Sequence, residues 1–296
     1  MTPQNRVENT AALKQAAKET KRYRESKKIL VIGETGTGKT HETMRFFNEE
    51  YTVSTPSKSG KKVLIYDVNG EFDYIDPISL FDIPKFNIQK VIEIRRILAR
   101  DPVTFEHLGD NGKYKLFEQI MKEKNSPRGM GLLLEDLNNY TINANSEKMI
   151  DVLTTNRHKE LDLFIHLQTF RAVPPRIWGN LNILRLHRTG DDVLQIKSKV
   201  KNFRLTLVGN ILVQNKCIED PRFFVFINYD DNTVSGNFNY SDIKRACQML
   251  LHVSAQDKLK LKMFKLENKN FKDENYVDLL IQEFTQPDKL WKTQKK

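Results

Sequence analysis

Short apolar runs recur along the chain, and most of them end in a polar or charged residue. An apolar run of four to eight residues between turn signals is typical of a buried strand. Five such strands are predicted, over residues 29–32, 62–67, 129–134, 161–168 and 181–186. Because helical segments are predicted between them, the order of elements indicates an α/β protein with a mainly parallel central sheet.

The segments around these strands carry helical or hairpin patterns. Helices are predicted over residues 41–48, 91–99, 104–124, 148–160 and 191–202. Two short strands, 223–228 and 233–238, flank a polar turn and predict a β-hairpin. The chain is therefore divided into a basic helical arm (1–26), a core (27–240) and a Lys-rich helical appendage (241–296).

The first predicted strand leads directly into a glycine-rich loop that fits G-x-x-x-x-G-K-[ST]. Its residues are Gly33, Glu34, Thr35, Gly36, Thr37, Gly38, Lys39 and Thr40. Glycines let backbone N–H groups approach phosphate closely, and the helix that follows directs its positive dipole end at the anion. Lys39 is expected to reach the β- and γ-phosphates, and Thr40 to offer its hydroxyl to Mg²⁺. This context of strand, loop and helix predicts a binding site for ATP or GTP.

Polar residues follow three of the other strands, at the edge where open α/β sheets bind ligands. Glu135 and Asp136 end the strand 129–134. One carboxylate is expected to hold Mg²⁺ through water and the other to orient the attacking water as a base. The usual order is Asp then Glu, so the reversed order here leaves the two roles open. Gln168 ends the strand 161–168 and could sense the γ-phosphate, whereas Asp67 and Glu71 receive no role.

Composition and charge indicate which class of partner the protein binds and in which cellular compartment it is expected. The 296 residues carry a net charge of +10, which favours polyanionic partners, nucleic acid first. The two cysteines, Cys217 and Cys247, have no metal-site spacing, so a reduced cytosol is expected. No apolar run approaches the roughly 20 residues of a membrane span. The N-terminus also lacks the apolar core of a signal peptide.

Three features resemble the FtsK/HerA superfamily of P-loop ATPases. Residues 66–72 (YDVNGEF) resemble its Asp…Gly-Glu-aromatic segment. Residues 157–162 followed by 164–169 resemble its run of an arginine, a strand and a glutamine. Pro174-Pro175 and the compact size resemble the viral genome-packaging branch. The resemblance covers residues 27–190.

The resemblance implies a three-layer P-loop NTPase sandwich of the additional-strand type, with ATP and Mg²⁺ as cofactors. In this type the Gln-tipped strand lies between the P-loop strand and the acid-tipped strand. It also implies a homo-oligomeric ring, a hexamer, with ATP at the subunit interfaces and double-stranded DNA through the centre. Arg157 matches the arginine finger that acts on a neighbour's ATP, with Arg171, Arg176 and Arg188 as alternatives. For the viral branch, the resemblance implies a capsid or portal-vertex protein as a docking partner. It also implies a location in the host cytoplasm and association with the virion.

The function predicted first is an ATP-hydrolysing DNA translocase that packages a viral genome. A cellular or conjugative motor of the same superfamily is the alternative, although such motors usually carry additional domains. Relatives of the zonular-occludens-toxin type usually have a membrane span. A P-loop GTPase is disfavoured because the guanine motif Asn-Lys-x-Asp is broken at Ile218. A small-molecule kinase would instead turn over as a monomer and be insensitive to DNA.

Overall fold

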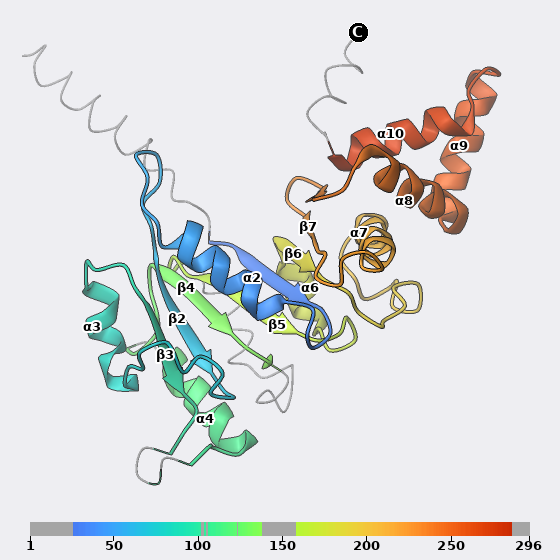
Figure 1. The fold of residues 1–296 in the computed structure, drawn as a ribbon. Coiled ribbons are helices and arrows are strands. Elements are labelled where there is room, and N and C mark those ends of the chain that lie inside the picture. Colours follow the sequence, from blue (N-terminus) through green and yellow to red (C-terminus); the bar gives the residue numbers. More distant parts are fainter. Residues whose placement is uncertain (1–25, 102–103, 105, 123, 138–157, 286–296) are drawn as a thin grey trace, which may run out of the picture.

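The computed structural model describes residues 26–101, 104, 106–122, 124–137 and 158–285, which form a sheet flanked by helices (Figure 1). Its strands are β1 (Lys28–Ile32), β2 (Lys62–Asp67), β3 (Ile94–Leu98), β4 (Met130–Leu134), β5 (Asp162–Leu167), β6 (Ile183–Leu186), β7 (Val225–Asn228) and β8 (Thr233–Gly236). Its helices are α2 (Lys39–Phe46), α3 (Ile83–Ile88), α4 (Asp110–Met121), α6 (Pro175–Asn180), α7 (Phe203–Lys216), α8 (Tyr240–Val253), α9 (Ala255–Glu267) and α10 (Asp273–Thr285). A π-helical turn, Phe47–Tyr51, extends α2, and a 3₁₀ turn, Leu80–Asp82, precedes α3.

The strands lie in the order β3-β2-β4-β5-β1-β6-β7-β8. The first six strands of this order are mutually parallel, and β7 and β8 add an antiparallel hairpin at one edge. Strand β5 lies between β1 and β4, as expected for the additional-strand type. The predicted fold class, a P-loop NTPase sandwich with a mainly parallel sheet, is therefore confirmed.

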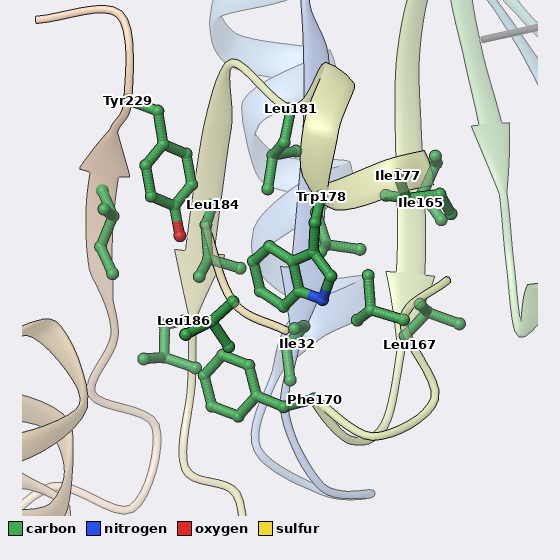
Figure 2. Packing of buried hydrophobic residues seen from close by; sticks show 14 of the residues in the cluster. Ile32, Ile165, Leu167, Phe170, Ile177, Trp178, Leu181, Leu184, Leu186 and Tyr229 are labelled. Atoms are coloured by element: carbon green, nitrogen blue, oxygen red, sulfur yellow. The ribbon is translucent and has the colours of Figure 1, made fainter. Parts of the chain in front are cut away.

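Side chains alternate between the two faces of each strand and divide the core into two layers. One face packs on α2 and the turn after it, through a cluster that includes Met44, Phe47, Tyr51, Val63, Ile65, Leu133 and Phe164. The opposite face packs on the helices α3, α4, α6 and α7. Figure 2 shows part of that second layer, where Trp178 and Phe170 stack with their ring centroids 6.0 Å apart and lie among aliphatic side chains of β1, β5 and β6.

Two predicted helices are wrong. Residues 91–99 contain strand β3, which pairs in parallel with β2 from Ile94 to Leu98. Four β-branched residues lie in that stretch, and such residues favour a pleated, half-buried surface. Residues 191–202 form turns. The helix α7 that follows was not predicted, because its residues 205–213 are all buried and no polar face marks the 3.6-residue period.

Other boundaries need smaller changes. The predicted helix at 104–124 is shorter in the structure. It begins at Asp110, directly after Gly109, and ends at Met121. The predicted helix at 148–160 lies largely outside the described residues, and residues 158–160 form a turn. The N-terminal arm up to residue 25 also lies outside them.

The predicted hairpin and the C-terminal helices are present. Buried side chains of α8 and α10 belong to the same apolar cluster as the sheet, with Ile243, Cys247, Leu250, Tyr276 and Leu280 among them. None of the helices in the described ranges combines the length and the apolarity that crossing a membrane requires.

Candidate nucleotide site

The glycine-rich loop connects β1 to α2 and has the backbone geometry of a phosphate cradle. Gly36 and Gly38 adopt left-handed conformations with φ of +81° and +86°, which side chains disfavour. Gly33 is needed for a different reason, because a Cβ atom there would lie 2.6 Å from His187 Cβ and 2.8 Å from Thr37 Oγ1. The three glycines therefore open the loop and allow its close approach to β6.

Lys39 lies folded against the inside of this loop. Its Nζ atom donates hydrogen bonds to the carbonyl oxygens of Gly33 at 2.6 Å and Glu34 at 2.9 Å. Burial lowers the pKa of Lys39, an effect that the nearby carboxylates of Glu135, Asp136 and Glu71 oppose. The ammonium group is thus held within reach of any anion that the loop cradles.

The hydroxyl of Thr40 meets the carboxylate of Glu135, at the end of β4. Thr40 Oγ1 donates to Glu135 Oε1 at 2.9 Å, and the Glu135 side chain is 6% exposed. Burial acts to raise the pKa of Glu135, but the charge of His166 beside it, with help from Thr40 and Lys39, brings it below its ordinary value. The carboxylate is therefore ionised at neutral pH.

A carboxylate and a hydroxyl side by side suit a hard cation such as Mg²⁺. Within the described residues, no three His, Cys, Asp or Glu side chains form a metal site by themselves. Mg²⁺ is usually held by one or two protein oxygens together with phosphates and water.

Asp136 and Glu71 lie at the same edge and are bridged by one amide. Asp136 has a φ of +45°, in the left-handed region that a non-glycine residue rarely adopts. Asn69 Nδ2 lies 3.2 Å from both Asp136 Oδ2 and Glu71 Oε1. Burial raises the pKa of Glu71, and the charges of Glu135 and Asp136 add to that effect. The turn after β2 therefore brings a third carboxylate to the site.

Asp67, to which the sequence assigned no role, supports that turn. Its Oδ1 accepts hydrogen bonds from the backbone N–H groups of Gly70 at 2.8 Å and Glu71 at 3.0 Å. Its Oδ2 accepts from Phe72 N at 3.3 Å and from Arg96 of β3 at 2.9 Å. Asp67 is thus a structural residue that fixes where Glu71 lies.

Gln168 and the candidate arginines lie around the site or outside the described residues. Gln168 is exposed and follows β5 directly, beside the start of the loop, where Gly33 N donates to Leu167 O at 3.3 Å. Arg157 falls in the range 138–157, which the structure does not describe.

The alternative arginines differ in their contacts. Arg188 forms an ion pair with Glu34 at 3.3 Å, and Arg171 hydrogen-bonds Gln195 at 2.8 Å. Arg176 is exposed on α6.

Sequence reasoning missed three buried polar residues on the α2 side of the sheet: His166 of β5, Arg185 of β6 and His187 just after β6. Arg185 donates to Lys39 O at 2.6 Å and also to Thr43 Oγ1. Burial lowers the pKa of Arg185 to about 10. A charged or polar residue near the end of an otherwise apolar strand was the available signal, because such a group needs a buried partner.

Comparison with known proteins places the fold. Neither the models of known protein families nor the sequences of curated proteins match this chain. Among solved structures, the chain is similar to the genome packaging NTPase B204 from Sulfolobus turreted icosahedral virus 2 in complex with ATP-gammaS. The identity is 13% and the TM-score 0.50, over 72% of this chain and 97% of that one.

Two bacterial structures are more distantly similar. The N-terminal domain of zonular occludens toxin from Neisseria meningitidis has 16% identity and a TM-score of 0.35, over 56% of this chain and 78% of that one. EssC (ATPases 2 and 3) from Geobacillus thermodenitrificans has 11% identity and a TM-score of 0.40, over 78% of this chain and 46% of that one. At 13% identity, the likeness to the B204 structure shows the fold alone.

Proposed function

We propose that this protein is an ATP-hydrolysing DNA translocase that packages a viral genome. The observation that carries the ATPase assignment is the 2.9 Å contact between Thr40 of the glycine-rich loop and Glu135 at the tip of β4. The two groups come from segments 95 residues apart, and strand β5 separates β1 from β4. Metal-assisted phosphoryl transfer requires this juxtaposition of a loop hydroxyl and an ionised acid.

Each residue of the site then has a role. The loop backbone from Gly33 to Thr40 cradles the phosphates, and Lys39 neutralises part of their charge. Thr40 and Glu135 hold Mg²⁺, which when bound neutralises charge on the β- and γ-phosphates.

The remaining polar groups act on the water and on the γ-phosphate. Asp136 orients the attacking water, because it is less buried than Glu135 and is therefore the more open of the two acids to solvent. Gln168 senses the γ-phosphate.

Translocation of DNA is supported by the charge of the chain and by the similarity of its fold. The net charge of +10 favours a polyanionic partner, and the solved structure with a TM-score of 0.50 is a viral genome packaging NTPase. We infer that subunits assemble in a homo-oligomeric ring around double-stranded DNA, and that Arg157 completes the neighbour's site. A capsid or portal-vertex protein is the docking partner in this proposal.

The first test measures ATP hydrolysis by the full chain, with and without double-stranded DNA, together with the oligomer mass. Lys39→Ala should abolish hydrolysis, because the charge that offsets the phosphates is lost. Arg45→Ala is the matched control, since Arg45 lies on the same helix with its side chain half exposed and forms ion pairs with Glu42 and Glu49. Wild-type activity in Lys39→Ala would refute the ATPase assignment. A strict monomer with DNA-independent turnover would point to a small-molecule kinase.

The second test concerns Arg157. Arg157→Ala should bind ATP normally and lose turnover, because the transition-state charge lacks its last partner. Subunits that carry both Lys39→Ala and Arg157→Ala can neither hydrolyse ATP nor supply the arginine to a neighbour. When they are mixed with wild-type subunits, activity should fall more steeply than in proportion to the wild-type fraction. A strictly linear loss would show that the arginine does not act across an interface.

A further inference from the structure

A chain of buried polar side chains runs beneath the glycine-rich loop and links three elements. His166 of β5 is fully buried. Its Nδ1 atom lies 2.6 Å from Glu135 Oε2 at the end of β4. Its Nε2 atom lies 2.9 Å from Thr43 Oγ1 of α2. The imidazole ring therefore spans the gap between the acid and the helix that follows the loop.

The far end of this chain is itself anchored. Thr43 Oγ1 donates to the carbonyl oxygen of Lys39 at 3.0 Å. Arg185 of β6 donates to the same carbonyl at 2.6 Å and to the Thr43 hydroxyl. These buried contacts hold the Thr43 hydroxyl in place beside the ring of His166.

At the end of this series of contacts nearest the glycine-rich loop, the contacts of Glu135 fix the orientation of its carboxylate. Its carboxylate uses Oε1 to accept from Thr40 and Oε2 to meet His166. An ionised carboxylate only accepts hydrogen bonds, and the 2.6 Å approach of Nδ1 to Oε2 is an ion-pair contact that lacks the alignment of a hydrogen bond. With Oε2 held in this way, Oε1 stays at the hydroxyl of Thr40, which is where the proposed function places the metal.

We propose that His166 is a positioning residue for the phosphoryl-transfer site. It holds Glu135 in the orientation that serves the metal, and it couples that orientation to the helix α2 through Thr43. Only strand β5 can supply such a residue, because it is the strand between β1 and β4. This inference rests on the proposed ATPase function and extends it.

The test uses two substitutions of His166, each of which keeps one of the two contacts of the imidazole ring and removes the other. His166→Asn places an amide N–H group near the position of Nδ1, so the contact with Glu135 is kept and the contact with Thr43 is lost. His166→Gln extends its amide toward the position of Nε2, so the contact with Thr43 is kept and the contact with Glu135 is lost. Loss of a group that orients a metal ligand typically costs about 10- to 100-fold in activity or metal affinity.

We expect His166→Gln to lose about 10- to 100-fold in kcat, while His166→Asn stays within about threefold of wild type by the same reasoning. The readout besides activity is the affinity for N-methylanthraniloyl-ADP, measured with Mg²⁺ and with EDTA. His166→Gln should lose the gain in affinity that Mg²⁺ confers and bind normally in EDTA. Circular dichroism and thermal melting check that both variants fold.

Equal behaviour of the two folded variants, whether both active or both impaired, would overturn the inference. Should His166→Gln fail to fold, His166→Leu supplies the second measurement, since it removes the nitrogen that faces Glu135. His166→Leu should lower the Mg²⁺-dependent gain in affinity, and an unchanged gain would also overturn the inference. Failure of the proposed function is separate, because it would appear as a wild-type protein without ATPase activity.

Discussion

At the scale of single residues, most of the candidate site consists of polar side chains at the ends of apolar strands. Asp67, Glu135, His166, Arg185 and His187 all lie on the α2 side of the sheet, at or near the end of their strands. Burial decides the chemistry of each group, because a buried charge or a buried nitrogen without a partner is costly. His187 shows the effect most clearly.

His187 Nδ1 donates to the carbonyl oxygen of Thr37 at 3.0 Å, while its Nε2 is buried and has no hydrogen-bond partner within the described residues. Burial, followed by the charge of Arg185, lowers the pKa of His187 from 6.5 to about 3, against the hydrogen bond to Thr37. The folded state thus binds fewer protons than the unfolded state between these values. Stability should be complete above pH 6.5 and fall as the pH drops toward 3, by about 1.4 kcal/mol per pH unit.

The measurement is urea unfolding of wild type and of His187→Asn between pH 7 and pH 5, a range chosen above most carboxylate titrations. Asparagine keeps a donor near the position of Nδ1 and does not titrate, so its stability should depend less on pH. His41→Asn is the control, because His41 is exposed and lies beside Glu42 on the surface of α2. Parallel curves for wild type and His187→Asn would contradict the prediction.

At the scale of elements, the turn after β2 is what delivers Asn69 and Glu71 to the site. Asp67 caps three backbone N–H groups of that turn and pairs with Arg96, which comes from the neighbouring strand β3. The turn is therefore held by the pairing of β2 with β3. The motif YDVNGEF was visible in the sequence, but the role of its first acid depended on an arginine from a segment that was predicted to be helical.

Asp67→Asn should lower the free energy of unfolding by about 2–4 kcal/mol, because Arg96 is left as a buried charge without its carboxylate. It should also lower kcat, since Glu71 is no longer fixed. Denaturant unfolding and steady-state ATPase assays measure the two effects. Asp76→Asn is the matched control, since Asp76 pairs with Arg95 at 3.1 Å with its own side chain 84% exposed. The control should change stability by less than about 1 kcal/mol, and an equal loss in both variants would refute the role of Asp67.

At the scale of the whole molecule, the C-terminal helices are attached to the sheet by a buried ion-pair network as well as by apolar contacts. Arg204 of α7 contacts both oxygens of Asp257 in α9, at 2.7 and 2.9 Å, and Glu283 in α10 at 2.7 Å. The hydroxyl groups of Tyr276 and Ser254 also donate hydrogen bonds to the carboxylate of Asp257. Residues 241–285 therefore pack on the core as a continuation of it, whether or not they act as a separate appendage.

Arg204→Met should destabilise the protein by about 3–5 kcal/mol, because Asp257 stays buried without its cation. The measurement is chemical denaturation in a Trp291→Phe background, followed by far-UV circular dichroism and by the fluorescence of the buried Trp178. Arg45→Met, which removes an exposed arginine, should cost less than about 1 kcal/mol. Coincident transitions for the two probes would show that the C-terminal helices unfold with the core, and a separate early loss of helix would support the appendage as an independent unit.

The sequence by itself determined the glycine-rich loop, the acid pair and every strand of the described sheet except β3. These features are local: apolar runs mark buried strands, and glycines with a lysine and a threonine have a fixed spacing along the chain. From them the fold class could be predicted, whereas the position of β5 between β1 and β4 was implied by the resemblance to the FtsK/HerA superfamily. Helix α7 and strand β3 could not, because full burial removes the polar face of a helix and because short apolar runs fit either element.

Only the tertiary structure decided which polar groups meet. That Glu135 contacts Thr40 and His166, that Asp67 serves Arg96 and a turn, and that Arg185 reaches the carbonyl oxygen of Lys39 all depend on strand order and register. Parallel strands bring residues distant in sequence to the same edge of the sheet, and no pattern along the chain encodes the distances between them. The partners of a buried polar side chain, and hence its pKa and its role, follow from that packing.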